Sequence, residues 1–282
     1  MSFHKKNKLV LISSLVLIIT GVIFIGIQLS NTNYLLAFYL KYISIVFNSC
    51  VCLVLAGAGY TLLQFSNSKK ARAFLVALSL LLIVICALTI SEHLFHFNAG
   101  IDGLFVPAGY SNPIAYPFTH GQMLPATAVV YLCLGLALIG FCTKFKFVHI
   151  LSQYFLHVAT IFCSILLIGF AYNGISLVNV LVHALNYLWL GGWIITLSIA
   201  ASFLHPSLGL TSLFSGTLVG NKMARRLFLM MAVSILVFGL VKLKYLGFTI
   251  WQYDTGSSLF VFCILVAALL IIWHTANLAE QG

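Results

Sequence analysis

Runs of about 20 apolar residues recur along the whole chain, and no other feature constrains its fold as strongly. Such a run is long enough to cross the hydrocarbon core of a bilayer as a helix, which satisfies its own backbone hydrogen bonds there. The sequence therefore predicts an all-α integral membrane protein with eight transmembrane helices in a single domain, residues 1–282. The predicted spans are residues 9–27, 42–64, 73–90, 124–142, 149–171, 179–203, 227–246 and 257–275.

The composition supports a membrane protein. Hydrophobic residues make up 62% of the chain and charged residues 6%, which excludes an ordinary soluble domain. The formal charge of +10 would suggest nucleic acid in a soluble protein, but here we expect Lys and Arg to face anionic membrane lipids, with no nucleic-acid partner. The seven Cys lie inside or beside apolar runs without a CxxC motif, so we expect no disulfide framework.

The positive charges predict the orientation of the spans. Lys and Arg concentrate in the cytoplasmic connections of multi-pass proteins. Here eleven of the fourteen lie in the N-terminal tail and the even-numbered connections: Lys5, Lys6, Lys8, Lys69, Lys70, Arg72, Lys144, Lys146, Lys222, Arg225 and Arg226. This alternation predicts that both termini are cytoplasmic and that the long loop at 91–123, between the third and fourth spans, lies on the outer side.

That loop is the most polar stretch of the chain. From Glu92 to Gln122 it contains no Lys or Arg, but it holds two of the four acidic residues and three of the nine His. Three prolines interrupt it, and a loop of this length is usually either functional or disordered. We interpret it as the cap over a ligand-binding pocket.

An internal repeat predicts how the pocket is built. The segments NSCVCLVLAGAG (48–59), ATAVVYLCLGLA (126–137) and HALNYLWLGGWI (183–194) align without gaps, and each has a Gly at its tenth position: Gly57, Gly135 and Gly192. Repeats of this kind commonly form one site from equivalent helices, and the glycines permit close helix packing. The polar first turns, with Asn48, Ser49, Thr127, His183 and Asn186, are expected to converge near the outer leaflet.

The predicted ligand-binding residues combine the loop with these first turns. They are Glu92, Asp102, His120, Thr127, His183 and Asn186. Ionisable groups in a membrane are costly unless paired, which makes them functional candidates. His157 is expected to be a core histidine bonded to a neighbouring carbonyl.

Other classes of function have less support in the sequence. Glu92, His93, His96 and His120 could be metal or haem ligands, but no HExxH or paired Cys/His motif accompanies them, so we predict no metal and no cofactor. No P-loop, GxSxG or kinase ATP motif is present, so we expect no enzyme activity and no catalytic residues. A small-molecule transporter stays open as an alternative, although no acidic residue lies inside a predicted span.

The order of motifs resembles the N-terminal multi-pass membrane sensor domain of bacterial sensor histidine kinases and diguanylate cyclases. The segments that carry the resemblance are SEHLFHFNAGIDGLF, HGQMLPATAVVYLCLGLALIG, HALNYLWLGGW and HPSLGLTSLFSGTLVGNKMARRLF. Gln122 stands where that family usually has Arg, and His93 where it usually has an aromatic residue. The matching positions are Glu92, Gly100, Ile101, Asp102, Met123, Pro125, Thr127, Ala128, Gly135, Arg225 and Arg226.

The resemblance implies signal transduction at the bacterial inner membrane, with the 91–123 loop in the periplasm. A small or amphiphilic ligand would bind near the outer leaflet, and the last helix would pass a conformational signal to a cytoplasmic PAS, kinase or cyclase output module. A homodimer is expected, because such outputs commonly act as dimers. The chain, which ends WHTANLAEQG, is expected to be either an excised sensor region or a natural stand-alone relative.

Overall fold

The computed structural model describes residues 7–29, 45–65, 68–101, 123–172, 177–216 and 220–223, with residues 225–227, 229–230, 233, 264, 266, 268–269 and 273. For residues 166, 168–172, 177–188 and 213 it describes the backbone alone. The seventh and eighth predicted spans, 227–246 and 257–275, therefore lie almost wholly outside the described residues, as do Asp102 and His120.

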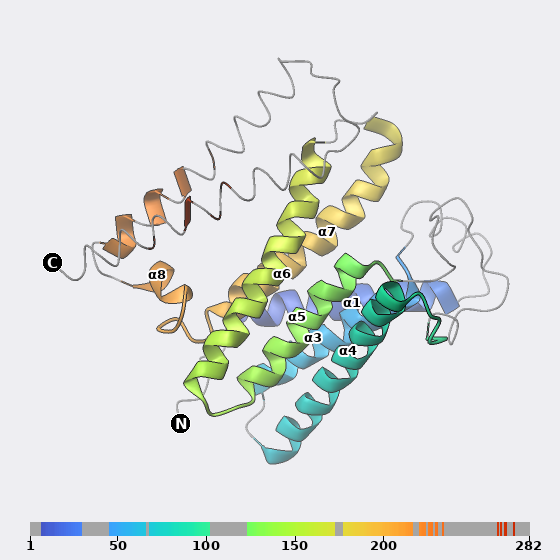
Figure 1. Ribbon diagram of the computed structural model, residues 1–282, viewed down its shortest axis with the longest axis horizontal. Helices are drawn as coiled ribbons and strands as arrows, with labels where there is room; N and C mark the ends of the chain where they lie inside the picture. The colour runs from blue at the N-terminus through green and yellow to red at the C-terminus, as the bar shows by residue number, and fades with distance from the viewer. Residues whose placement is uncertain are drawn as a thin grey trace.

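The regular structure of the described part is helical (Figure 1). It consists of α1 (Lys8–Leu29), α3 (Phe47–Phe65), α4 (Lys69–Phe95), α5 (Pro125–Phe141), α6 (Lys146–Tyr172), α7 (Leu177–Ser202) and the short α8 (Thr211–Ser215). Within those same residues no strand occurs. The predicted all-α class is thus confirmed, and each of the first six predicted spans coincides with one of these long helices.

Four helices of the described part are long and apolar enough to cross a membrane. They are α1, α3, α4 and the first 20 residues of α6, Lys146–Ile165. Helix α5 and the segment Trp189–Ser202 of α7 are apolar but shorter. These lengths support a membrane protein.

Helix α4 extends further than the sequence suggested. Its start is fixed by Ser68, whose Oγ accepts a hydrogen bond from the Ala71 backbone N–H at 3.1 Å. It ends at Phe95, because His96 adopts the left-handed conformation with φ of 52°. Glu92 and His93 therefore belong to the helix and not to the following loop. Polar side chains at a helix end do not break the helix, and the first proline comes only at Pro107.

The helices form one closed bundle. Each long helix packs against the next in the sequence, α3 also contacts α5, and α1 contacts α7. Most of α3 is buried, so it is the central helix, whereas fewer than half of the residues of α1, α4 and α6 are buried. Consecutive helices joined in this way run antiparallel, and α3 packs against α1, α4 and α5 (Figure 1).

The repeated glycines have different roles. A Cβ at Gly57 would lie 2.6 Å from the Ser14 carbonyl oxygen, so α1 and α3 are nearly in backbone contact. A Cβ at Gly135 would lie 2.9 Å from Ile83 Cγ1 of α4. At Gly192 the close approach expected from the repeat is not seen, since a Cβ there would meet no atom of the described residues within 4 Å. The adjacent Gly191 faces α6 instead, with Leu167 at 3.3 Å.

Large apolar side chains point outward while small polar ones are buried. Exposed apolar residues follow helical spacing along α1 and α4, and include Leu9, Ile12, Ile19, Val22, Phe74, Leu81 and Val84. The buried hydroxyls of Ser13, Ser79 and Thr89 donate to carbonyls one turn earlier in their own helices. In water this arrangement would be unfavourable, whereas in lipid the apolar surface is solvated.

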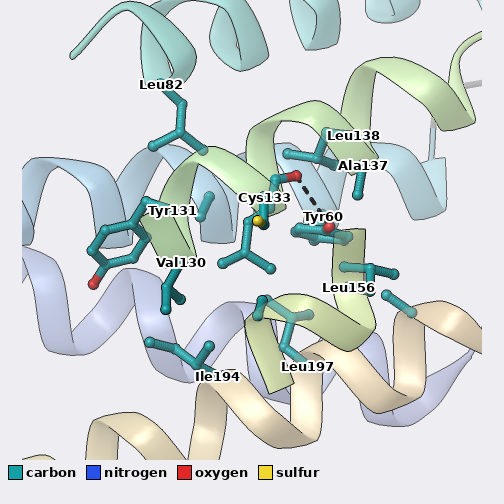
Figure 2. Packing of buried hydrophobic residues seen from close by; sticks show 14 of the residues in the cluster. Tyr60, Leu82, Val130, Tyr131, Cys133, Ala137, Leu138, Leu156, Ile194 and Leu197 are labelled. Carbon is teal, nitrogen blue, oxygen red and sulfur yellow. Dashed lines mark hydrogen bonds between the residues drawn. The ribbon is translucent and has the colours of Figure 1, made fainter. Parts of the chain in front are cut away.

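The centre of the bundle is apolar (Figure 2). Tyr60 of α3 is fully buried, and its hydroxyl donates to the Leu134 carbonyl of α5 at 3.2 Å. Leu138, Leu156 and Leu197 pack in the same cluster from α5, α6 and α7. This core separates two polar ends of the bundle.

Candidate ligand-binding site

Glu92 is the outstanding polar group at one end of the bundle, in the last turn of α4. Its side chain is 2% exposed, and its Oε1 accepts a hydrogen bond from the Ala99 backbone N–H at 2.6 Å. Its other carboxylate oxygen, Oε2, is also buried and has no hydrogen-bond partner among the residues that the structure describes. A buried carboxylate with one oxygen unsatisfied is costly and requires an explanation.

The segment that follows α4 folds back over this carboxylate. His96 turns the chain with its left-handed backbone, and Gly100 has φ of 75°. The Asn98 Oδ1 accepts from the Gly100 N–H at 2.7 Å, which closes a local turn. The bond from Ala99 to Glu92 then holds the segment against α4.

The same segment also reaches the first turn of α3. Asn48 is 7% exposed, and its Nδ2 donates to the Ile101 carbonyl at 3.4 Å. The end of α1 joins this group, because Gln28 Nε2 donates to the Ile45 carbonyl at 3.3 Å and to Cys50 Sγ at 3.4 Å. We name the region formed by Gln28, residues 45–50, 92–101 and 123–127 the carboxylate end.

The structure brings together only some of the predicted site residues. Glu92 lies at the carboxylate end, and Thr127 is half-buried in the first turn of α5 at the same end, after the fully buried Met123. His183 and Asn186 lie on α7, but their side chains are not among those described. The predictions for Asp102 and His120 fall outside the described residues.

The alternative metal site gains no support from the described residues. The Nδ1 of His93 is 2.9 Å from the Thr89 carbonyl oxygen, and His96 is exposed beyond the helix end. In this part of the chain, no three His, Cys, Asp or Glu side chains are grouped so that they could hold a metal ion.

Sequence reasoning missed a second polar region at the opposite end of the bundle. The Nδ1 of His149 in α6 and the Nε2 of His205, just after α7, form a hydrogen bond at 2.7 Å, and His149 Nε2 donates to the Thr143 carbonyl at 3.0 Å. Phe141 packs against both imidazole rings. We name the region formed by Asn7, Gln64, residues 141–153 and 198–216 the histidine end.

Gln153 connects the helices at the histidine end. It is 1% exposed, and its Nε2 donates to the carbonyls of Ser202 and His205 at 3.0 and 2.8 Å. It thereby caps α7 from α6, which satisfies carbonyls that have no partner within the helix. The signal in the sequence was the spacing of His149, Gln153 and His157, which places all three on one face of a helix.

The same register continues one turn deeper. His157 lies four residues after Gln153 on α6, and Ser198 lies four residues before Ser202 on α7. Because Gln153 bonds to Ser202 and the two helices are antiparallel, this spacing places His157 and Ser198 at the same level. The His157 Nε2 and the Ser198 Oγ are both buried and lack hydrogen-bond partners within the described part. The expected bond from this histidine ring to a neighbouring carbonyl is therefore not seen at Nε2.

Two further contacts extend the histidine end. Asn7 lies just before α1, and its backbone N–H donates to Gln64 Oε1 of α3 at 3.0 Å, while its Nδ2 donates to the Ala200 carbonyl of α7 at 3.2 Å. After α8, Arg225 donates from Nη1 to the carbonyls of Phe214 and Gly216 at 2.6 and 2.9 Å. The connection after α7 is thus ordered by side-chain caps and is not a plain linker.

The fold and these two ends define an all-helical protein with membrane-type helices and a buried, incompletely satisfied carboxylate. Comparison with models of known protein families, with curated proteins and with solved structures found no match.

Proposed function

We propose that the chain is the membrane-embedded sensory input domain of a bacterial signal-transduction protein, without catalytic activity of its own. It spans the inner membrane eight times, binds a small or amphiphilic ligand at the carboxylate end, and passes a conformational signal through its last helix to a cytoplasmic output module. The observation that carries this proposal is the Glu92 carboxylate, which is buried at a helix end with one oxygen free.

The contacts between helix ends support the alternation of the first six spans that the positive charges predict, because each contact joins ends that the proposed topology places on the same side. Asn7 precedes α1, and it bonds to the last turn of α3 and to the last turn of α7. These three points are all cytoplasmic in the proposed topology. The bonds of Gln28 and Asn48 join points that are all periplasmic in it. If a span before α7 were missing or misplaced, some of these bonds would join a cytoplasmic point to a periplasmic one.

The order at the histidine end supports a route for the signal. Gln153 ties α6 to the end of α7, and the Arg225 guanidinium ties α8 to the start of the next helical segment. A shift of α6 against α7 would therefore change the contacts at the point where the chain enters its last two proposed spans. A ligand can move this equilibrium only by its difference in affinity for the two states.

The experiment perturbs one end and measures the other. Thr127→Ala and His183→Ala should each change amide hydrogen exchange in residues 204–216 by about two-fold to thirty-fold in lipid nanodiscs, which is the usual range of coupling between distant sites. Thr20→Ala, midway along α1, is the control and should leave these amides unchanged. Exchange that changes only around the substituted residue would contradict the proposal, and loss of membrane assembly in both variants would make the two residues structural.

A transporter is the second candidate, and the His157 and Ser198 layer is the observation that favours it. These polar groups continue the polar contact between α6 and α7 from the histidine end toward the middle of the bundle. Carriers place polar groups at this depth. Uptake of substrate by proteoliposomes would support a transporter, whereas coupling between the two ends without flux would favour the sensor.

A further inference from the structure

The free oxygen of Glu92 restricts the chemistry of the ligand. Glu92 already accepts one short hydrogen bond at its Oε1, from the Ala99 N–H at 2.6 Å. Its Oε2 is buried and has no protein donor in the described part of the chain. The group that completes the site must therefore donate a hydrogen bond, and a positive charge would also offset the buried negative one.

The described carboxylate end supplies no Lys or Arg to Glu92, and its two histidines, His93 and His96, form no hydrogen bond to Oε2. Residues 45–50, 92–101 and 123–127 contain neither Lys nor Arg, although the whole chain carries a formal charge of +10. Protonating Glu92 would not complete the site either, because a hydroxyl at Oε2 would need an acceptor, and the described residues offer none within hydrogen-bond distance.

A metal ion is a poorer candidate than an organic cation. Metal ions in proteins take several oxygen, nitrogen or sulfur ligands at once. The described residues show no group of three or more His, Cys, Asp or Glu around Glu92 or elsewhere. One free carboxylate oxygen is instead suited to a single ammonium group, which donates directional N–H bonds.

The surface beside the site is apolar. Leu94, Phe95 and Phe97 are 68%, 75% and 45% exposed, directly after Glu92 at the end of α4. In the proposed orientation these side chains lie at the outer membrane interface, where apolar and aromatic groups meet both lipid and headgroups. A molecule that reaches Glu92 from this side would carry an apolar chain behind its polar group.

We propose that Glu92 binds the ammonium group of a cationic amphiphile that enters from the outer leaflet. This inference rests on the proposed sensory function and names the ligand class of the same site. The ammonium group could belong to a free alkylamine or to the headgroup of an ethanolamine lipid, and both would place an N–H donor on Oε2.

The test compares three molecules that share a chain and differ in the head group. Saturable binding of octylammonium, octanol and octanoate to the purified protein in dodecyl maltoside is measured by the shift in unfolding temperature. Octylammonium should bind about tenfold or more tightly than octanol, as expected for a hydrogen bond to a charged group. Octanoate should not bind at this site.

Glu92→Gln keeps the acceptor for Ala99 and removes the charge. It should abolish the preference for octylammonium over octanol, while Glu280→Gln, the same change at another acidic residue, should preserve it. Glu92→Asp, which keeps the charge, should retain part of the preference and provides the test if the glutamine variant does not fold. Repeating the measurement in phosphatidylglycerol nanodiscs with and without phosphatidylethanolamine distinguishes the two sources. Competition by the ethanolamine lipid in the wild type alone would identify the headgroup.

Equal binding of octylammonium and octanol by the wild type would overturn the inference, as would a preference that survives Glu92→Gln or an absence of saturable octylammonium binding. None of these results depends on signalling. The sensory function would fail separately, if octylammonium bound with the expected preference and hydrogen exchange at residues 204–216 did not change.

Discussion

The two ends of the bundle are built differently, although the same helices form both. At the histidine end, Asn7 and Gln153 form hydrogen bonds of 2.8–3.2 Å that join helices across the bundle, while the buried Gln64 Nε2, Gln153 Oε1 and Thr211 Oγ1 lack partners among the described residues. At the carboxylate end, the bonds of Gln28 to Ile45 and Cys50 and of Asn48 to Ile101 are 3.3–3.4 Å long, and the atom without a partner in the described part is a carboxylate oxygen, Glu92 Oε2. The unsatisfied groups are thus neutral at the histidine end and acidic at the carboxylate end, which suits a domain that binds a cation at one end and responds at the other.

The largest expected effect is at the histidine end. Gln153→Leu leaves the Ser202 carbonyl without its side-chain donor and removes one of the two donors of the His205 carbonyl, which also accepts from the Leu208 N–H, and it should lower the free energy of unfolding by about 1–3 kcal/mol, the cost of a buried unsatisfied group. The matched variant Gln28→Leu, at the carboxylate end, should cost about 1 kcal/mol or less. Both are measured by denaturant unfolding in detergent micelles. Equal losses would remove the contrast between the ends.

The two glycines in the middle of the bundle, Gly57 and Gly192, should respond differently to an added methyl group. Gly57→Ala places a methyl group against the Ser14 carbonyl and should lower the free energy of unfolding by about 1–3 kcal/mol, as overpacking does. Gly192→Ala meets open space and should instead stabilise α7 by about 0.5–1 kcal/mol. The unfolding midpoints of the two variants should move in opposite directions. A common direction would show that the α1–α3 contact is not close.

Removing the charge at the carboxylate end should have a smaller effect than the Gln153 variant. In the absence of ligand, Glu92→Gln should change the free energy of unfolding by about 1 kcal/mol or less, because the amide still accepts from the Ala99 N–H but replaces an unsatisfied oxygen with an unsatisfied NH2 group. Glu280→Gln is the same change at another acidic residue and provides the comparison. A loss of more than about 3 kcal/mol in a Glu92→Gln protein that keeps its fold would show that the chain already satisfies the carboxylate.

The smallest effect is expected at α8. Arg225→Ala removes the donor to two carbonyls and should speed hydrogen exchange within residues 211–216 by a factor that corresponds to about 1 kcal/mol. The neighbouring Arg226 is exposed, so Arg226→Ala should leave the exchange unchanged. Equal exchange in both variants would show that the cap does not hold α8.

The apolar pattern predicted the helices well because length and hydropathy are local properties. Helix α1 spans 8–29 where 9–27 was expected, and α6 spans 146–172 where 149–171 was expected. The prediction for α4 stopped at residue 90, because polar residues were taken to begin the loop. A polar residue in the last turn of a helix satisfies the same pattern, and only the left-handed backbone at His96 separates the two cases.

The candidate site could be predicted only in part. Glu92 stood out because an acidic residue is rare in this chain, but its burial depends on the turn at 96–101 and on Asn48, 53 residues from Ile101. The histidine end was missed because its partners are distant in sequence: Asn7 and Ala200 are 193 residues apart. Gln153 also carries no charge, and its spacing with His149 and His157 marks a polar face of α6 but does not identify the α7 carbonyls that this face contacts.

The most direct measurement is hydrogen exchange at both ends in one sample of the protein in lipid nanodiscs, with and without octylammonium. The account predicts slower exchange at residues 45–50 and 96–101, where the ammonium group completes the site, and a simultaneous change at residues 204–216. Slower exchange at the carboxylate end with no change at the histidine end would contradict the claim that the two ends are coupled.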